Sequence, residues 1–233
     1  MIIPLVADED WLDAFRDLPA LTLPDRPVLM VVPHPDDEVL GAGALIATLR
    51  REGISVTVIA ATDGENAYDT AEEERVQLRA TREREQTAAL DSLGVSSEQI
   101  RRLRLPDSGL MQVEERLTQE VSRIATDDML LLAPWVGDFH PDHEVCGRAA
   151  ATVADARGLP LLSYFFWTWH RGTPGLLEGL SLKKFDVDED ALAAKLNALS
   201  FHRSQLIRTA DEPILPERLL APAQWTFEVF LSA

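Results

Sequence analysis

The sequence predicts an α/β fold: a Rossmann-like, mostly parallel sheet with helices on both faces. Short apolar runs rich in β-branched residues alternate with longer helix-forming stretches, an order typical of parallel sheets. The 233 residues, 46% of them apolar, suffice for one domain with a sizeable core. Because no linker or repeat divides the chain, we expect a single domain over residues 1–233, with residues 1–25 as an N-terminal extension packed on it.

The first strand is expected at residues 28–32, which are apolar and mostly β-branched and end at Pro33. Helix-forming residues follow at 39–51. A second buried strand is expected at 55–62, and a charged helix at 71–93 stops before Gly94, because glycine favours the helix C-terminus.

The second half of the chain continues the alternation. A third strand at 100–105 leads to a helix at 113–126, and a fourth strand at 129–133 leads through a loop to a helix ending near residue 157. Residues 161–167 form a fifth apolar run, and 182–187 are expected as an edge strand. A last helix is expected at 190–200, with Asp188 or Asp190 near its N-terminal cap.

Two acidic motifs with histidines follow two of these strands. HPDDE occupies residues 34–38, HPDH occupies residues 140–143, and together they contain three of the five histidines. Because side chains beyond the carboxyl ends of parallel strands meet at one edge of the sheet, we expect both motifs to lie together.

The residue types in the two motifs predict a metal site. Histidine nitrogen and carboxylate oxygen are zinc ligands, and a catalytic zinc usually keeps three protein ligands and one position for water. We assign His34, Asp37 and His143 as ligands of one Zn²⁺ per chain, with Fe²⁺ as an alternative for such a set. Asp36 then lies beside the metal as a general base. Cys146 is the only cysteine, which excludes a site built of cysteine ligands.

A strand ending in PHPDDE, with a distant D-x-HPDH element, resembles the PIG-L/LmbE-like superfamily of metal-dependent deacetylases. The resemblance implies an LmbE-like fold and hydrolysis of the N-acetyl group of an N-acetylglucosaminyl-containing small molecule. It also implies that His140 faces the developing oxyanion, with Asp142 orienting His140. Whether Asp36 or His140 protonates the leaving amine stays open. Looser similarities extend over most of the chain, among them the TDGE loop at residues 62–65 and the HRSQ element at 202–205.

Two further residues are predicted to bind substrate. Arg82 offers a rigid fork of donors to sugar hydroxyls or a phosphate, although an ion pair on its charged helix is an equally good interpretation. Asp107 follows the third strand, where it would contact sugar hydroxyls or cap the loop. Trp135, Trp167 and Trp169 would line an aglycone site or, more commonly for such residues, belong to the core.

Three other functions compete with deacetylation of an amino sugar. The motifs fix a metal and a water but not the acyl donor, so another amide is an alternative substrate. A non-catalytic metal-binding domain is a second alternative, against which the presence of Asp36 argues. A two-metal phosphoesterase would need more ligands than the two motifs provide.

Composition limits the partners. With 39 acidic and 22 basic residues, the net charge of −17 disfavours binding to nucleic acid or anionic lipid. The sequence contains no apolar run long enough for a membrane span, and its acidic N-terminus is unlike a signal peptide, so we expect a cytoplasmic protein. The expected partner is a small amino-sugar conjugate; a homo-oligomer is compatible with the sequence, which leaves the oligomeric state open.

Overall fold

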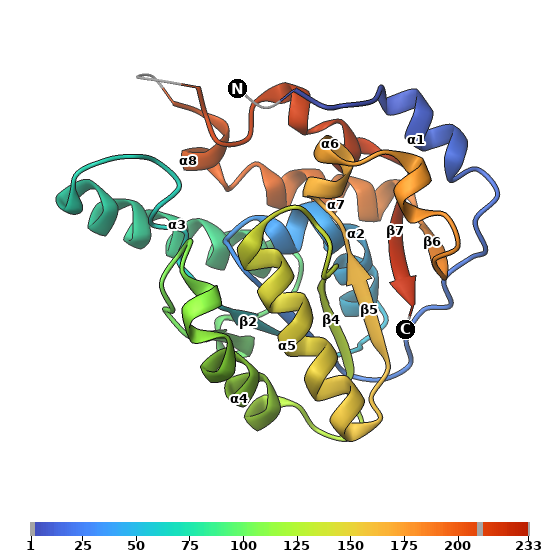
Figure 1. Cartoon of the computed structure of the whole chain (residues 1–233), viewed down its shortest axis with the longest axis horizontal. Coiled ribbons are helices and arrows are strands. Elements are labelled where there is room, and N and C mark those ends of the chain that lie inside the picture. The colour runs from blue at the N-terminus through green and yellow to red at the C-terminus, as the bar shows by residue number, and fades with distance from the viewer. Residues whose placement is uncertain (1–2, 209–211, 233) are drawn as a thin grey trace.

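The computed structural model describes residues 3–208 and 212–232, and within them the chain forms a seven-stranded sheet in the order β3-β2-β1-β4-β5-β7-β6 (Figure 1). The first five strands run parallel, and β7 pairs antiparallel with both β5 and β6. The strands are β1 (Val28–Val32), β2 (Val56–Ala60), β3 (Ile100–Arg102), β4 (Leu130–Pro134), β5 (Leu161–Tyr164), β6 (Leu182–Asp186) and β7 (Phe227–Ser232).

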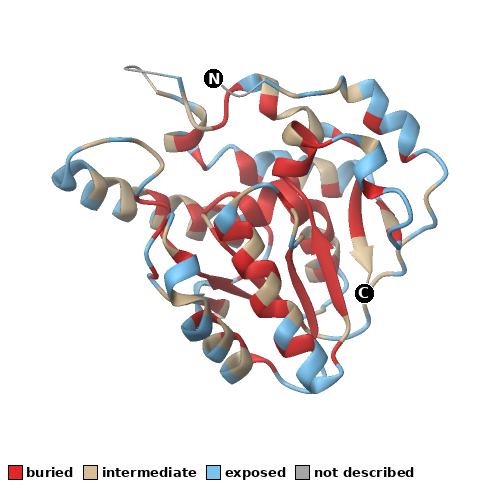
Figure 2. Ribbon diagram, in the orientation of Figure 1, coloured by how far each residue is buried: buried red, intermediate tan, exposed pale blue. Residues whose placement is uncertain are grey.

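Helices cover both faces of the sheet, because alternate side chains of β1 are buried on opposite sides. Val28, Met30 and Val32 pack in one apolar cluster with side chains of α2, α3 and α7, whereas Leu29 and Val31 pack in a second cluster with α4 and α5. Buried residues fill the central strands (Figure 2). The helices are α1 (Asp8–Ala14), α2 (Asp37–Arg51), α3 (Glu72–Ser92), α4 (Glu114–Ile124), α5 (Pro141–Arg157), α6 (Trp167–Arg171), α7 (Glu189–Leu199) and α8 (Arg203–Leu206).

The order of the strands reverses between β1 and β4. The chain leaves β1 toward β2 on one side, and the strand on the other side of β1 is β4. In open parallel sheets, such a reversal leaves a crevice beyond the carboxyl ends of the two strands, which is where ligands bind. The segments that follow β1 and β4 contain the HPDDE and HPDH motifs, so the topology places both at this crevice.

The structure adds elements that the sequence analysis does not predict. The expected strand at 161–167 ends at Tyr164, and Trp167 begins the short helix α6. The strand β7 inserts between β5 and β6, which leaves β6 at the edge as predicted. The N-terminal segment contains α1, from which Trp11 packs against Trp169. No helix in the described part of the chain combines the length and apolar character needed to cross a membrane.

The helix α2 is irregular in its interior. Ala42 has non-helical backbone angles (φ −151°, ψ 23°), and the backbone amides of Ala44 and Leu45 each donate a 2.9 Å hydrogen bond to the Glu228 carboxylate on β7. Glu228 also accepts a 2.8 Å bond from the buried Lys195 ammonium of α7. Glu228 therefore links α2, just after the irregular residue Ala42, to both β7 and α7.

Candidate metal centre

The Asp37 carboxylate lies between two imidazole rings. Its Oδ2 atom is 3.1 Å from His34 Nδ1 and 3.2 Å from His143 Nε2, and it also accepts a 3.0 Å hydrogen bond from the His34 backbone amide. Two ligands of a tetrahedral zinc with bonds of about 2.0–2.1 Å lie about 3.4 Å apart. Asp37 Oδ2 thus lies near a nitrogen of each of the other two predicted ligands, His34 and His143, and the assignment of these three residues as ligands of one ion stays a prediction.

One nitrogen of His143 faces this site without a partner. His143 Nε2 is buried and has no hydrogen-bond partner among the described residues, although Asp37 Oδ2 lies near it. Its other ring nitrogen, Nδ1, is 2.8 Å from Asp138 Oδ2. Burial lowers the pKa of His143, but Asp37 and Asp138 outweigh that effect and raise it to about 9. An unpaired nitrogen with a carboxylate behind the ring is the arrangement of a metal-binding histidine.

His34 has carboxylates on both sides. Its Nε2 atom is 3.3 Å from Asp107 Oδ1 and 3.3 Å from Asp142 Oδ2. Burial lowers the pKa of His34, but hydrogen bonds to Asp107, Asp142 and Asp37 raise it well above the usual value. Within the described residues, two sets of three residues have potential ligand atoms that all lie within 4.8 Å of one another, and both sets include His34. One set is His34, His140 and His143, and the other is His34, Asp107 and Asp142. Asp37, the third predicted ligand, belongs to neither set.

Asp142 differs from its expected contact. We expected its carboxylate to orient His140, but the carboxylate contacts His34 and accepts hydrogen bonds from the backbone amides of Ser108 and Leu110 at 2.8 and 3.2 Å. Only its own backbone amide reaches His140, donating to Nδ1 at 3.3 Å, because His140 is the N-cap of α5. The carboxylate therefore fixes the ring of His34.

Asp36 occupies a strained position. Its backbone φ is 112°, a value that residues other than glycine rarely adopt, and it forms the N-cap of α2. Its Oδ2 atom is 3.4 Å from Arg82 Nη2. Burial raises the pKa of Asp36 well above its usual value, although Arg82 counteracts this. A raised pKa makes a carboxylate a stronger base, which is the property that a general base requires.

His140 forms another wall of the site. Its ring stacks on Trp167, with centroids 5.8 Å apart and planes at 17°. Burial lowers its pKa to about 3, and the neighbouring His34 and His143 contribute in the same direction. His140 is therefore neutral at physiological pH in this arrangement and retains one ring N–H as a donor.

The two residues predicted to contact substrate are also engaged by the protein. Arg82 donates to the carbonyl oxygens of Gly64 and Pro35 at 2.7 and 2.8 Å, besides contacting Asp36. Asp107 accepts a 2.7 Å hydrogen bond from the Asn66 backbone amide. Both line the same cavity, so substrate binding by Arg82 and Asp107 stays a prediction. Within the protein, Arg82 already contacts Asp36, and Asp107 already contacts His34.

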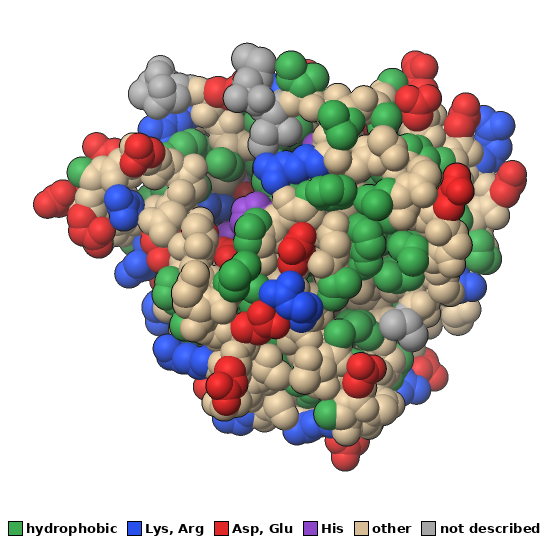
Figure 3. Space-filling model, viewed as in Figure 1, with side chains coloured by type: hydrophobic (Ala, Val, Ile, Leu, Met, Phe, Trp, Pro, Cys, Tyr) green, Lys and Arg blue, Asp and Glu red, His purple; other side chains and the backbone are tan. Residues whose placement is uncertain are grey.

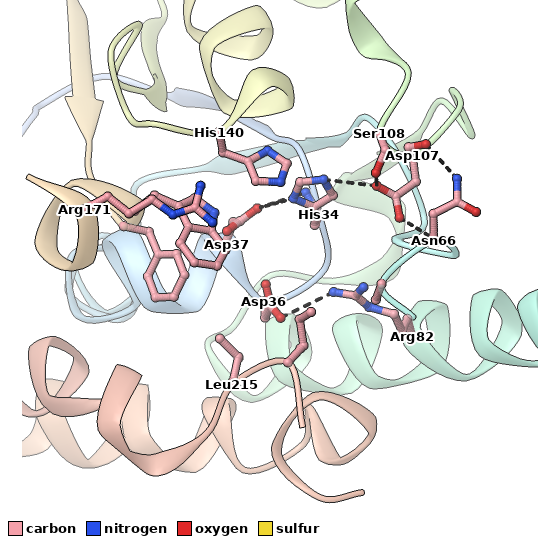
Figure 4. Close-up of a pocket in the computed structure, with 14 residues that line it drawn as sticks. His34, Asp36, Asp37, Asn66, Arg82, Asp107, Ser108, His140, Arg171 and Leu215 are labelled. Carbon is pink, nitrogen blue, oxygen red and sulfur yellow. Dashed lines mark hydrogen bonds and ion pairs between the residues drawn. The ribbon is translucent and has the colours of Figure 1, made fainter. Parts of the chain in front are cut away.

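These residues surround a cavity of about 280 Å³ (Figure 4). On the surface, histidine is visible in a hollow bordered by basic and apolar side chains (Figure 3). Of the three tryptophans considered for the aglycone wall, Trp167 lines the cavity, whereas Trp135 and Trp169 pack in the aromatic cluster with α1. The complete lining is His34, Asp36, Asp37, Asn66, Ala67, Arg82, Asp107, Ser108, His140, Phe166, Trp167, Arg171, Ile214 and Leu215.

The sequence analysis assigns no role to Asp138. This fully buried carboxylate contacts His143 and accepts hydrogen bonds from the backbone amides of Phe166, Trp167 and Thr168 at 2.9–3.2 Å. It therefore links the HPDH motif to the start of α6. The signal available in the sequence was its position two residues before HPDH, within the D-x-HPDH element.

A known protein family matches the part of the chain that contains both motifs. The family model described as PIG-L, GlcNAc-PI de-N-acetylase, matches residues 29–154, which include both motifs. A Bacillus subtilis protein named probable N-acetyl-alpha-D-glucosaminyl L-malate deacetylase 2 is 33% identical over 129 residues, or 52% of this chain and 58% of that protein. The chain thus matches little more than half the length of that relative. A Bacillus cereus protein of the same name is 28% identical over 196 residues, covering 78% of this chain and 84% of the relative.

A solved structure is similar over most of its length. The zinc-inhibited form of teicoplanin deacetylase Orf2 superposes with a TM-score of 0.68 at 20% identity, covering 88% of this chain and 97% of that chain. At this identity the likeness concerns the fold, and it confirms the predicted α/β class with its sheet flanked by helices.

Proposed function

The chain belongs to the PIG-L family, and on that basis we propose that it is a zinc-dependent hydrolase that removes the N-acetyl group from an N-acetylglucosaminyl-containing small molecule. The motif resemblance is confirmed at the level of the family. The two Bacillus relatives are named for deacetylation of such a conjugate, which supports the substrate class.

One observation carries the proposal: the Asp37 carboxylate lies between His34 and His143, and a second carboxylate, Asp36, opens into the same cavity. We assign His34, Asp37 and His143 as the ligands of the zinc. When bound, the zinc would acidify the attacking water and polarise the acetyl carbonyl. A carboxylate that is beside these ligands, but not needed as one, is what distinguishes a hydrolase from a domain that merely stores metal.

Asp36 acts as the general base in this proposal. Its carboxylate takes a proton from the attacking water, while Arg82 restricts the side chain to the cavity side of the HPDDE turn. His140 is neutral and donates its remaining ring N–H to the oxygen on which negative charge develops. Asp138 and the pair of Asp107 and Asp142 hold the rings of His143 and His34 in place.

The test is acetate release from a panel of N-acetylglucosaminyl compounds by zinc-loaded protein. We expect the wild type to release acetate and Asp36→Asn to release little. The variant is prepared in parallel because acetate release in both samples would reveal a contaminating enzyme. Zinc and iron are measured per chain in the same samples, with about one ion expected for this donor set. No release from any compound, with one ion bound, would reject the amino-sugar substrate and direct the search to other amides.

A further inference from the structure

A second arginine reaches the cavity from the side opposite Arg82 (Figure 4). Arg171 is the last residue of α6, and its guanidinium carbon lies 4.2 Å from the centroid of the Trp167 ring. Its Nη1 atom donates a 2.6 Å hydrogen bond to the Phe139 carbonyl oxygen. The stacking and the hydrogen bond together fix the plane of the guanidinium before any ligand arrives.

Among the described residues, the other donors of Arg171 have no hydrogen-bond partner. Within the described part of the chain, no carboxylate lies at ion-pair distance from Arg171, whereas Arg82 contacts Asp36 and two backbone carbonyls. Other arginines of the described residues, such as Arg84, also have no carboxylate at ion-pair distance, but Arg171 lines the cavity. Burial lowers the pKa of Arg171, and the charge of Asp138 acts in the opposite direction. A fixed, partly dehydrated cation without an internal partner is suited to an external anion.

The carboxylates of the cavity do not compete for this cation. Asp36 contacts Arg82, Asp37 contacts two imidazoles, and Asp107 accepts from Asn66 and contacts His34. On the remaining walls, Ala67, Ile214 and Leu215 are apolar. Apart from the proposed zinc, an anionic group on a ligand would therefore find Arg171 as the cation of the cavity wall that has no carboxylate at ion-pair distance within the described residues.

We propose that Arg171 selects substrates whose aglycone carries an oxyanion, either a carboxylate or a phosphate. The inference rests on the proposed deacetylase function, because it concerns the group attached to the sugar. The planar guanidinium donates two parallel hydrogen bonds to either anion, while the Trp167 ring holds the guanidinium plane in position. Arg171 is thus a specificity-determining residue, distinct from the residues that hold the metal.

The experiment compares three N-acetylglucosaminides with the same sugar: a neutral hydroxyethyl glycoside, the carboxymethyl glycoside of similar size, and the anomeric phosphate. Acetate release gives kcat and KM for each with the wild type, Arg171→Gln and Arg171→Lys. We expect the preference for the acidic compounds, expressed as a ratio of kcat/KM to the neutral one, to fall roughly 10- to 100-fold in Arg171→Gln, mostly through KM. Arg171→Lys should recover part of the ratio, because it keeps the charge but loses the fork. Which acidic compound loses more distinguishes a carboxylate from a phosphate.

Arg84→Gln is the matched control, since Arg84 is exposed on α3 and outside the cavity, and the substitution removes the same charge. An unchanged ratio in Arg171→Gln, or equal loss with all three compounds through kcat, would overturn the proposal. Calorimetric titration of the same glycosides separates this result from failure of the proposed function. If no compound is hydrolysed, a roughly 10-fold or greater loss of affinity for the acidic glycosides in Arg171→Gln still supports an anion site; equal affinities reject it.

Discussion

Asp36 and Asp37 are adjacent in sequence, and their surroundings shift their pKa values in opposite directions. Both are buried, and burial raises the pKa of each; contacts with His143 and His34 bring the pKa of Asp37 far below its usual range, whereas Arg82 offsets only part of the shift at Asp36. One carboxyl group is therefore held as an anion and the other is ready to exchange a proton. Such a division of adjacent acids into different roles is typical of hydrolytic sites.

Replacing Asp36 with asparagine should separate catalysis from metal binding. The amide would keep the size of the side chain but would not accept a proton, so we expect turnover to fall by roughly 10²- to 10⁴-fold. The metal content should stay at the wild-type level, as measured by elemental analysis beside initial rates of acetate release. The exposed Asp155 on α5 provides the control, as Asp155→Asn should leave both quantities unchanged. Full activity in Asp36→Asn would remove this residue from the mechanism.

His202 should make the protein acid-sensitive. The side chain is fully buried, and neither ring nitrogen has a hydrogen-bond partner in the described structure. Burial, with a smaller contribution from Arg82, lowers its pKa to about 3. Between this value and about 6.5 the unfolded chain binds a proton that the folded chain does not, so stability falls as the pH falls.

The measurement is urea unfolding of the wild type and His202→Gln at pH 7 and pH 5. Relative to the variant, the wild type should lose about 2 kcal/mol of unfolding free energy over this range. Equal losses of unfolding free energy in the two proteins would mean that His202 acquires its proton in the folded state without a loss of stability.

At the scale of elements, α2 depends on a strand that comes much later in the sequence. Glu228 of β7 accepts from two amides that follow the irregular residue Ala42, and it pairs with Lys195 of α7. Both charged groups are at most 5% exposed. The part of α2 that follows Ala42 is thus fixed by β7 and α7 as well as by its own sequence.

Glu228→Gln should destabilise the protein by about 3–5 kcal/mol, because it leaves the Lys195 ammonium buried without its partner. The double variant Glu228→Gln/Lys195→Met should recover part of this loss, because no unpaired charge remains. Chemical denaturation of the two single variants and the double variant gives the coupling energy between the residues. Additive effects would show that the two side chains act independently.

For the molecule as a whole, the sequence predicted most strands and helices and the edge at which the motifs meet. The β-branched run before Pro33 and the helix-forming residues after HPDDE were sufficient for that. Strand β7 was missed because Glu228 interrupts its apolar pattern, and the use of this carboxylate as an acceptor for α2 is visible only in three dimensions. Likewise, α6 was read as part of a strand, since residues 161–167 are uniformly apolar or aromatic apart from Ser163 and its start is defined by Asp138, over twenty residues earlier.

The contacts within the site could likewise be predicted only in part from the sequence. The position of each motif after one of two neighbouring strands was enough to predict that His34, Asp37 and His143 lie close together. The sequence did not indicate that Asp142 would contact His34, or that Arg171 would lie over Trp167. These contacts depend on how the loops after β3 and β5 fold over the edge of the sheet, and no short-range pattern determines that.

Loading with zinc should stabilise the whole fold, since the ligands come from two segments that are separate in the unfolded chain. At a free zinc concentration about 1,000 times the dissociation constant, the unfolding free energy should rise by about 4 kcal/mol. Thermal melting with zinc and after chelation measures the difference. The stabilisation by zinc should be small in His143→Ala, because a ligand is missing. If zinc stabilised that variant as much as the wild type, the proposed ligand set would be refuted.

The backbone at Asp36 has a consequence for the evolution of the chain. A residue with a side chain at φ 112° costs the fold about 1–3 kcal/mol, and glycine would relieve most of that strain. Selection for thermal resistance alone would therefore favour losing the carboxylate at this position. Under the proposed function, its presence is a trade-off in which the protein gives up stability for activity.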